Sequence, residues 1–112
     1  MKKIEATIKP FKLDEVKEML WSIGVDGLIV SEIKGCSKQE GHAELYRGGE
    51  YVIDYLVMIK LELIVADKMA PTVVEAIQRA ARTGRIGDGK IVVMPIDDAI
   101  RIRTGEHGTS TL

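Results

Sequence analysis

The sequence is poor in the residues on which several kinds of chemistry depend. Its single cysteine, Cys36, excludes an internal disulfide and fits a reducing compartment. There are two histidines, His42 and His107, and a histidine outside a recognisable motif is most often an ordinary surface residue. Cys36 and His42 lack the third orienting group of a nucleophilic pair and the further ligands of a metal centre. We therefore expect that the chain is not an enzyme.

An excess of charge and long apolar runs are also missing. Sixteen basic residues face 17 acidic ones, so the net charge of −1 implies no general attraction to nucleic acid or to anionic membranes. No apolar run is long enough to span a bilayer, and the opening residues lack the apolar core of a signal peptide. We expect a cytoplasmic protein whose 112 residues form one domain, 1–112.

What the sequence does contain is a strand–helix–strand pattern that occurs twice. Alternating polar and apolar residues, or short apolar runs, indicate strands, and apolar residues at helical spacing indicate two helices. The predicted strands cover residues 3–9, 28–33, 57–65, 91–94 and 100–103, and the helices cover about 13–23 and 68–81. Asp67 is a candidate N-cap for the second helix, which Gly84 terminates.

This order predicts an α+β fold of the ferredoxin-like kind, a (βαβ)2 sandwich with both helices on one face and a short C-terminal strand. A polar segment of about residues 36–54 separates the second and third strands, and a loop of that length is usually functional. Residues 105–112 read as a flexible tail. The uncovered face of the sheet carries polar and apolar residues together, so we expect a homo-oligomer.

Residues 83–90 form the most distinctive stretch, because three of the chain's 11 glycines fall there. Closely spaced glycines let backbone N–H groups approach an anion, and Lys90 adds a positive charge. The stretch matches most of a Walker A loop, but Ile91 stands where a serine or threonine would hold Mg²⁺, and the flanking elements are reversed. A phosphate site of another kind and a plain glycine-rich turn remain open.

Ferredoxin-like sheets also occur in RNA-binding modules, which stack bases on aromatic residues of the central strands. Aromatic residues make up 4% of this chain, and residues 60–63 contain none. The sequence therefore predicts no nucleic-acid partner.

Three segments together resemble the PII nitrogen-regulatory signal-transduction proteins. They are residues 46–51 (YRGGEY), 83–91 (TGRIGDGKI) and 101–105 (RIRTG). Residues 1–4 and 8–13 and Gly35 fit as well, so the resemblance covers essentially the whole chain.

The resemblance implies a homotrimer that binds ATP or ADP in clefts between subunits. Its long loop would control nitrogen-metabolism targets, an ammonium transporter or enzymes, with membrane contact only through a transporter. A nucleotide-sensing paralogue with a target outside nitrogen metabolism is the alternative. The implied nucleotide-binding residues are Thr7, Gly35, Lys38, Glu62, Ile64, Thr83, Gly84, Gly87, Asp88, Gly89, Lys90, Arg101 and Arg103, of which the two arginines would come from the neighbouring subunit.

The resemblance also implies roles within the long loop. Gln39 matches the residue that coordinates Mg²⁺ together with ATP phosphates and 2-oxoglutarate. Arg47 matches the arginine that plugs the pore of an ammonium transporter. Tyr51 matches the tyrosine that some members have nucleotidylylated.

The sequence departs from the family pattern at Met58, where a lysine usually binds a carboxylate of 2-oxoglutarate. Losing such a charge-assisted contact costs about 1.5–3 kcal/mol, which leaves 2-oxoglutarate sensing in question. Lys60 lies on the same predicted strand face and is the candidate substitute. At position 38 a lysine replaces the usual arginine, which exchanges a bidentate phosphate contact for a point charge.

Overall fold

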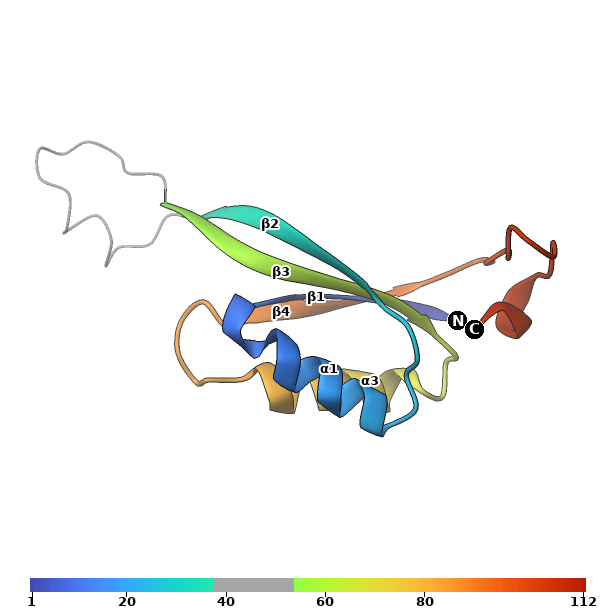
Figure 1. Cartoon of the computed structure of the whole chain (residues 1–112), viewed down its shortest axis with the longest axis horizontal. Coiled ribbons are helices and arrows are strands. Elements are labelled where there is room, and N and C mark those ends of the chain that lie inside the picture. Colours follow the sequence, from blue (N-terminus) through green and yellow to red (C-terminus); the bar gives the residue numbers. More distant parts are fainter. Residues whose placement is uncertain (38–53) are drawn as a thin grey trace, which may run out of the picture.

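The computed structural model describes residues 1–37 and 54–112, which form a four-stranded antiparallel sheet with two α-helices on one face (Figure 1). The α-helices are α1 (Leu13–Ser22) and α3 (Ala70–Ala81), and short 3₁₀ turns are η1 (Pro10–Lys12) and η2 (Gly108–Thr111). The strands are β1 (Lys2–Ile8), β2 (Ile29–Ser37), β3 (Asp54–Val65) and β4 (Gly89–Pro95), in the spatial order β2-β3-β1-β4. The predicted α+β, ferredoxin-like architecture is confirmed.

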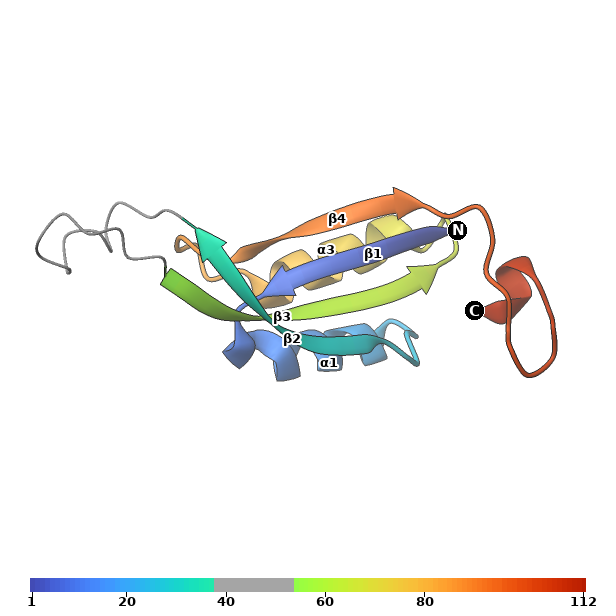
Figure 2. The same ribbon diagram turned by 90° about the horizontal axis from the view of Figure 1, so that it is seen from above.

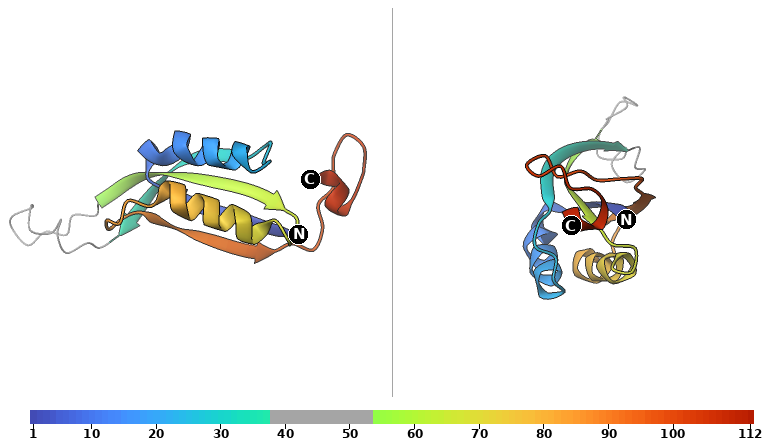
Figure 3. Two further views of the ribbon diagram at one scale, coloured as in Figure 1. Left: turned by 90° about the horizontal axis from the view of Figure 1, so that it is seen from below. Right: turned by 90° about the vertical axis from the view of Figure 1, so that its right-hand side faces the viewer.

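The core lies between the sheet and the helices, which run side by side beneath it (Figure 3). Ile4 on β1 stands opposite Leu63 of β3 and Val93 of β4, and alternate residues of the two central strands point to the same side. Their apolar side chains pack on the helix stripes that the periodicity predicted. The fully buried large side chains are Ile4, Ile8, Val16, Leu20, Leu61, Val73 and Ile77.

Several predicted boundaries differ from the structure. Strand β2 continues to Ser37 and β3 begins at Asp54, so both enter the segment that the sequence assigned to a loop. Helix α3 begins at Ala70 and has Met69 as its N-cap. Asp67 is therefore not the N-cap, and its carboxylate instead pairs with the amino group of Met1 at 2.8 Å.

The predicted fifth strand over 100–103 is wrong. Ile100 makes a single bridge with His107, and the chain then turns, with the Gly105 N–H donating to the Arg101 carbonyl at 2.8 Å. Gly105 and Gly108 have φ of 74° and 75°, and this left-handed backbone folds the segment on itself. The tail that was expected to be flexible contains η2. An alternating pattern does not form a strand without a neighbouring strand to pair with.

The sheet face opposite the helices carries a neutral group of four charges, which we call the charge quartet: Lys3, Glu5, Lys60 and Glu62. Lys3 Nζ lies 3.2 Å from Glu5 and 3.1 Å from Glu62, and Lys60 Nζ lies 3.7 and 3.8 Å from the same two carboxylates. The hydrogen bond from Lys3 lowers the pKa of Glu62 and raises that of Lys3. No helix covers this face in the described chain (Figure 2).

Apolar side chains surround the charge quartet. Ile29, Ile64 and Val92 occupy the same face and are 63%, 38% and 38% exposed. A face that balances its own charges and exposes apolar residues around them is typical of a surface that packs against a partner.

The core predicts the outcome of one truncation. Leu61→Ala should lower the free energy of unfolding by about 2–5 kcal/mol, because it removes a fully buried side chain and leaves a cavity. Met19→Ala, on the exposed side of α1, is the control and should change it by less than about 0.5 kcal/mol. Urea unfolding at one fixed protein concentration measures both, and equal effects would contradict the core assignment.

Candidate functional site

The glycine-rich segment 83–90 connects the end of α3 to the start of β4 (Figure 3). Helix α3 closes with the Arg82 N–H donating to the Gln78 carbonyl at 3.1 Å, after which the chain enters a turn. Gly84, Gly87 and Gly89 have φ of 82°, 91° and 97°, a region that residues with a side chain rarely adopt. The three glycines therefore set the path of this loop.

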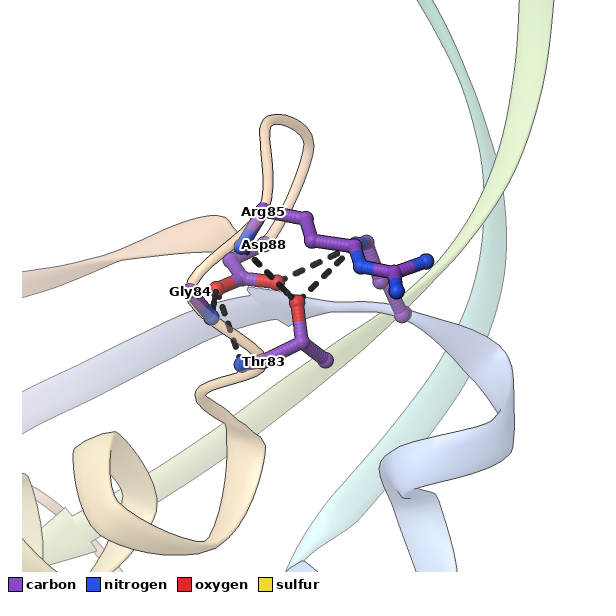
Figure 4. A network of polar contacts seen from close by, with 5 residues as sticks. Thr83, Gly84, Arg85 and Asp88 are labelled. Carbon is purple, nitrogen blue, oxygen red and sulfur yellow. Dashed lines mark hydrogen bonds and ion pairs between the residues drawn. The ribbon is translucent and has the colours of Figure 1, made fainter.

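The Asp88 carboxylate holds the loop together from inside (Figure 4). Its Oδ2 accepts the backbone N–H groups of Thr83 and Gly84, each at 2.9 Å, and its Oδ1 accepts the Thr83 hydroxyl. These hydrogen bonds, that from the Thr83 hydroxyl first, lower the pKa of Asp88 far below its usual range. Asp88 is ionised at neutral pH and ties both ends of the turn to one point.

Lys9 joins this network from the end of β1. Its Nζ lies 3.2 Å from Thr83 Oγ1 and 3.2 Å from Asp88 Oδ1, and its side chain is 19% exposed. The Thr83 hydroxyl oxygen also accepts the Arg85 N–H at 3.1 Å. The sequence patterns did not single out Lys9, which directly follows β1 and lies beside the loop because Ile8 pairs with Gly89.

This network gives Asp88 a specific function within the described chain. Both of its oxygens are engaged by loop atoms and Lys9, so it acts as an organiser of the loop. The charge on Lys9 offsets the carboxylate, which would otherwise repel an anion. Phosphate binding by the loop backbone and by Lys90 stays a prediction.

Gly89 is required where β4 approaches β1. A Cβ added there would lie 1.7 Å from the Thr7 carbonyl oxygen and 2.7 Å from its carbonyl carbon. Both atoms are backbone in a paired strand, and neither can move aside without breaking the register of β1 and β4.

A cavity of about 430 Å³ lies beside the loop, between α3 and the paired strands β1 and β4. This volume is within the range of small-ligand pockets. Four predicted nucleotide-binding residues line it: Thr7, Asp88, Gly89 and Lys90. Gln78 and Arg82 add polar groups from the helix side, and Ile77 and Ile91 add apolar surface.

Other predicted site residues lie elsewhere on the sheet. Glu62 and Ile64 are on β3, and Glu62 belongs to the charge quartet. Gly35 is on the edge strand β2, opposite Leu56. Lys38, Gln39, Arg47 and Tyr51 fall outside the described residues.

Arg101 and Arg103 lie at the opposite end of the molecule from the loop. Strand β4 leaves the loop at Gly89, opposite Ile8, and ends at Pro95, opposite Lys2. Its seven residues span about 20 Å, and the segment after Pro95, which contains both arginines, lies beyond that end (Figure 2). One chain therefore does not bring its own arginines to its own glycine loop.

Comparison with known proteins identifies the family. Residues 1–106 match the family model described as "Nitrogen regulatory protein P-II". The chain belongs to the PII family. The chain is 63% identical to the "Nitrogen regulatory protein P-II" of Rhodospirillum rubrum and 59% identical to that of Azospirillum brasilense, each over 108 residues and 96% of both chains. A protein of the same name from Bradyrhizobium diazoefficiens is 58% identical over all 112 residues, the full length of both.

Membership of the PII family agrees with the expectation that the chain is not an enzyme, because PII proteins are signalling regulators and not enzymes. The described residues contain no group of three or more histidine, cysteine, aspartate or glutamate side chains placed to hold a metal. Among the same residues, no helix is both long and apolar enough to cross a membrane.

Replacement of Gly89 tests the tight approach of β4 to β1. Gly89→Ala should lower the free energy of unfolding by about 3 kcal/mol or more, since its Cβ overlaps backbone and its φ is positive. Gly84→Ala is the matched control. Gly84 also has a positive φ, but a Cβ added there would meet no atom within 4 Å, so this substitution should lower the free energy of unfolding by about 1–2 kcal/mol. Thermal unfolding compares them, and equal costs would show that the close contact is unimportant.

Proposed function

We propose that this PII protein is a homotrimer that binds ATP or ADP in clefts between its subunits and transmits nucleotide occupancy through the segment 38–53 to a nitrogen-metabolism target. One observation carries the proposal, namely that the glycine loop and Arg101 and Arg103 lie at opposite ends of one chain. A second copy supplies the arginines to the loop of the first.

The glycine loop supports this proposal because its own residues and Lys9 hold it in place. Asp88 and Lys9 fix the turn, so backbone N–H groups need no reordering when an anion arrives. Lys90 at the start of β4 provides a further positive charge beside the cavity. The loop backbone and Lys90 would bind the phosphates, and the partner's two arginines would bind them from the other side of the cleft.

The uncovered sheet face supports the trimer. Its charge quartet is neutral and internally paired, so a partner can cover it without leaving an unpaired charge. The surrounding apolar residues Ile29, Ile64 and Val92 provide area to bury. Glu62 and Ile64, two of the predicted nucleotide-binding residues, lie on this face, which favours a nucleotide cleft between subunits.

The segment 38–53 would transmit the signal. Mg²⁺ prefers oxygen ligands and takes several of them from nucleotide phosphates, so Gln39 would join the metal only when Mg-ATP is present. ADP lacks the third phosphate and would leave the segment in another state. Lys38 would add a charge near the phosphates, and Arg47 and Tyr51 would present the outcome to a transporter pore or a modifying enzyme.

The relatives favour a nitrogen-metabolism target over one outside nitrogen metabolism, since those named above carry the name nitrogen regulatory protein. The target is an ammonium transporter or a nitrogen-metabolism enzyme. The protein would act in the cytoplasm and meet a membrane only through a transporter.

The surroundings of Met58 bear on 2-oxoglutarate. Met58 is paired with Ile33 across β2 and β3, and its neutral side chain offers no cation to a carboxylate. Lys60 lies 3.7 Å from Glu5 and 3.8 Å from Glu62, so its charge is already balanced by two acids. We infer that Lys60 does not substitute and that 2-oxoglutarate adds little to ATP binding.

Arg103→Gln tests the nucleotide proposal. It should raise the dissociation constant for ATP about 10-fold or more. The reason is that this arginine would no longer make its charge-assisted contact with the phosphate bound by the neighbouring subunit. Arg79→Gln, on the exposed surface of α3, makes the same charge change away from the cavity and should leave the constant unchanged. Calorimetric titration with Mg-ATP measures both. The proposal would be refuted if the unaltered protein did not bind ATP, or if the unaltered protein and both variants bound it with equal affinity.

Met58→Lys tests the 2-oxoglutarate inference. The unaltered protein should bind ATP with the same affinity whether or not 2-oxoglutarate is present. Met58→Lys should gain a 2-oxoglutarate-dependent increase in ATP affinity of about 10-fold, since it restores the missing ion pair. Met58→Leu is the neutral control. Strong, Mg-dependent synergy in the unaltered protein would show that Lys60 or another group serves in place of the lysine.

A further inference from the structure

The segment that carries the two arginines is closed at its base by one carboxylate. Asp98 Oδ1 accepts the backbone N–H groups of Ala99 at 2.9 Å and Gly108 at 3.1 Å, and Asp98 Oδ2 lies 2.7 Å from Nδ1 of His107. Asp98 thus holds a residue that lies ten positions further along the sequence. We call this arrangement the tail clasp, consisting of Asp98, His107 and the Gly108 N–H.

The tail clasp closes a hairpin with Arg101 inside it. The Gly108 N–H also donates to the Ala99 carbonyl at 3.0 Å, and the Arg101 N–H donates to the Glu106 carbonyl at 2.9 Å. The Arg101 carbonyl accepts the Gly105 N–H at 2.8 Å, and its Nη2 donates to the Thr111 carbonyl at 3.3 Å. The direction of the Arg101 guanidinium therefore depends on where residues 105–111 are held.

We propose that Asp98 and His107 are positioning residues for Arg101, and that the charge pair between them tightens the clasp and raises nucleotide affinity. The inference rests on the proposed function, in which Arg101 and Arg103 bind the phosphates held by a neighbouring subunit. It adds a positioning element to that site, remote from the glycine loop.

The charges of the clasp set the direction of the effect. With a protonated ring, His107 and Asp98 form an ion pair, and the hydrogen bond from His107 is the largest cause of the lowered pKa of Asp98. A neutral side chain at position 107 leaves at most a neutral hydrogen bond of about half the strength. The other charged groups of the hairpin are Asp97, Arg101, Arg103 and Glu106.

The exposure of the clasp limits the size of the effect. The side chains of His107 and Asp98 are 62% and 44% exposed, so solvent screens their attraction. We expect loss of the ion pair to weaken nucleotide binding by about two- to fivefold.

The test compares the full-length protein with His107→Gln and His107→Arg in calorimetric titrations with Mg-ATP at about pH 6. The ratio of variant to unaltered dissociation constants is the readout. For His107→Gln, which removes the charge, the ratio should be about 2–5. For His107→Arg, which keeps a positive charge, it should be about 1.

Two controls separate this inference from the function on which it rests. Arg103→Gln reports whether the arginines bind nucleotide at all, and Asp97→Asn makes the charge change of Asp98→Asn one residue away. If Arg103→Gln weakens binding and the His107→Gln ratio stays at 1, the clasp proposal is overturned and the proposed function stands. If Arg103→Gln has no effect, both fail.

Hydrogen exchange gives a readout that needs no nucleotide. Asp98→Asn should speed exchange of the Gly108 amide, which donates to that carboxylate, and Asp97→Asn should leave the rate unchanged. Equal rates in the two variants would overturn the clasp whatever the binding data show.

Discussion

The Asp88 carboxylate is the point on which the candidate site depends. It gathers the N–H groups of Thr83 and Gly84, the Thr83 hydroxyl and the Lys9 ammonium into one network. A loop with three glycines would otherwise have many backbone conformations to lose on folding. The carboxylate restricts them, and Lys9 connects the loop to the central strand. The Asp88 carboxylate, whose charge Lys9 balances, therefore fixes the shape of the loop.

The other half of the proposed cleft follows the same principle. At the opposite end of the sheet Asp98 gathers the N–H groups of Ala99 and Gly108 and the His107 ring, and so holds the hairpin that carries Arg101. Asp88 and Asp98 thus accept hydrogen bonds from their own segments, and each holds one of the two basic sides of the proposed phosphate site in place. The charge quartet on the uncovered sheet face lies on the strands between them and balances its own charges.

Much of the fold could be predicted because the patterns are local. The alternation of Ile4, Ala6 and Ile8 and the helical spacing of Val16 and Leu20 identified buried faces that the structure confirms. The fifth strand could not be excluded, because pairing is a property of neighbours and not of the residues 100–103 themselves. Asp67 fits an N-cap by type, yet the nearby amino terminus of Met1 engages it instead.

The candidate site could be predicted only in part, because some of its contacts join residues that lie far apart in the sequence. Gly84, Gly87 and Gly89 could be singled out because their positive φ has a sequence signature, which the structure bears out. Lys9 could not, because its partner Thr83 lies 74 positions away and only the register of β1 and β4 brings them together. Family resemblance assigned Asp88 to the site, but its inward hydrogen bonds became visible only with the loop folded.

The pairing of the first strand with the last has a kinetic consequence. β1 is central and contacts β4 only after nearly the whole chain is available, and such distant pairings are slow to form. The contact between Lys9 and Thr83 therefore depends on the pairing of β1 with β4. Until that pairing forms, the glycine loop lacks both its lysine and its strand partner. A nascent or partly folded chain would carry every residue of the loop without its shape, so the anion binding proposed for this loop would require that β1 and β4 have already paired.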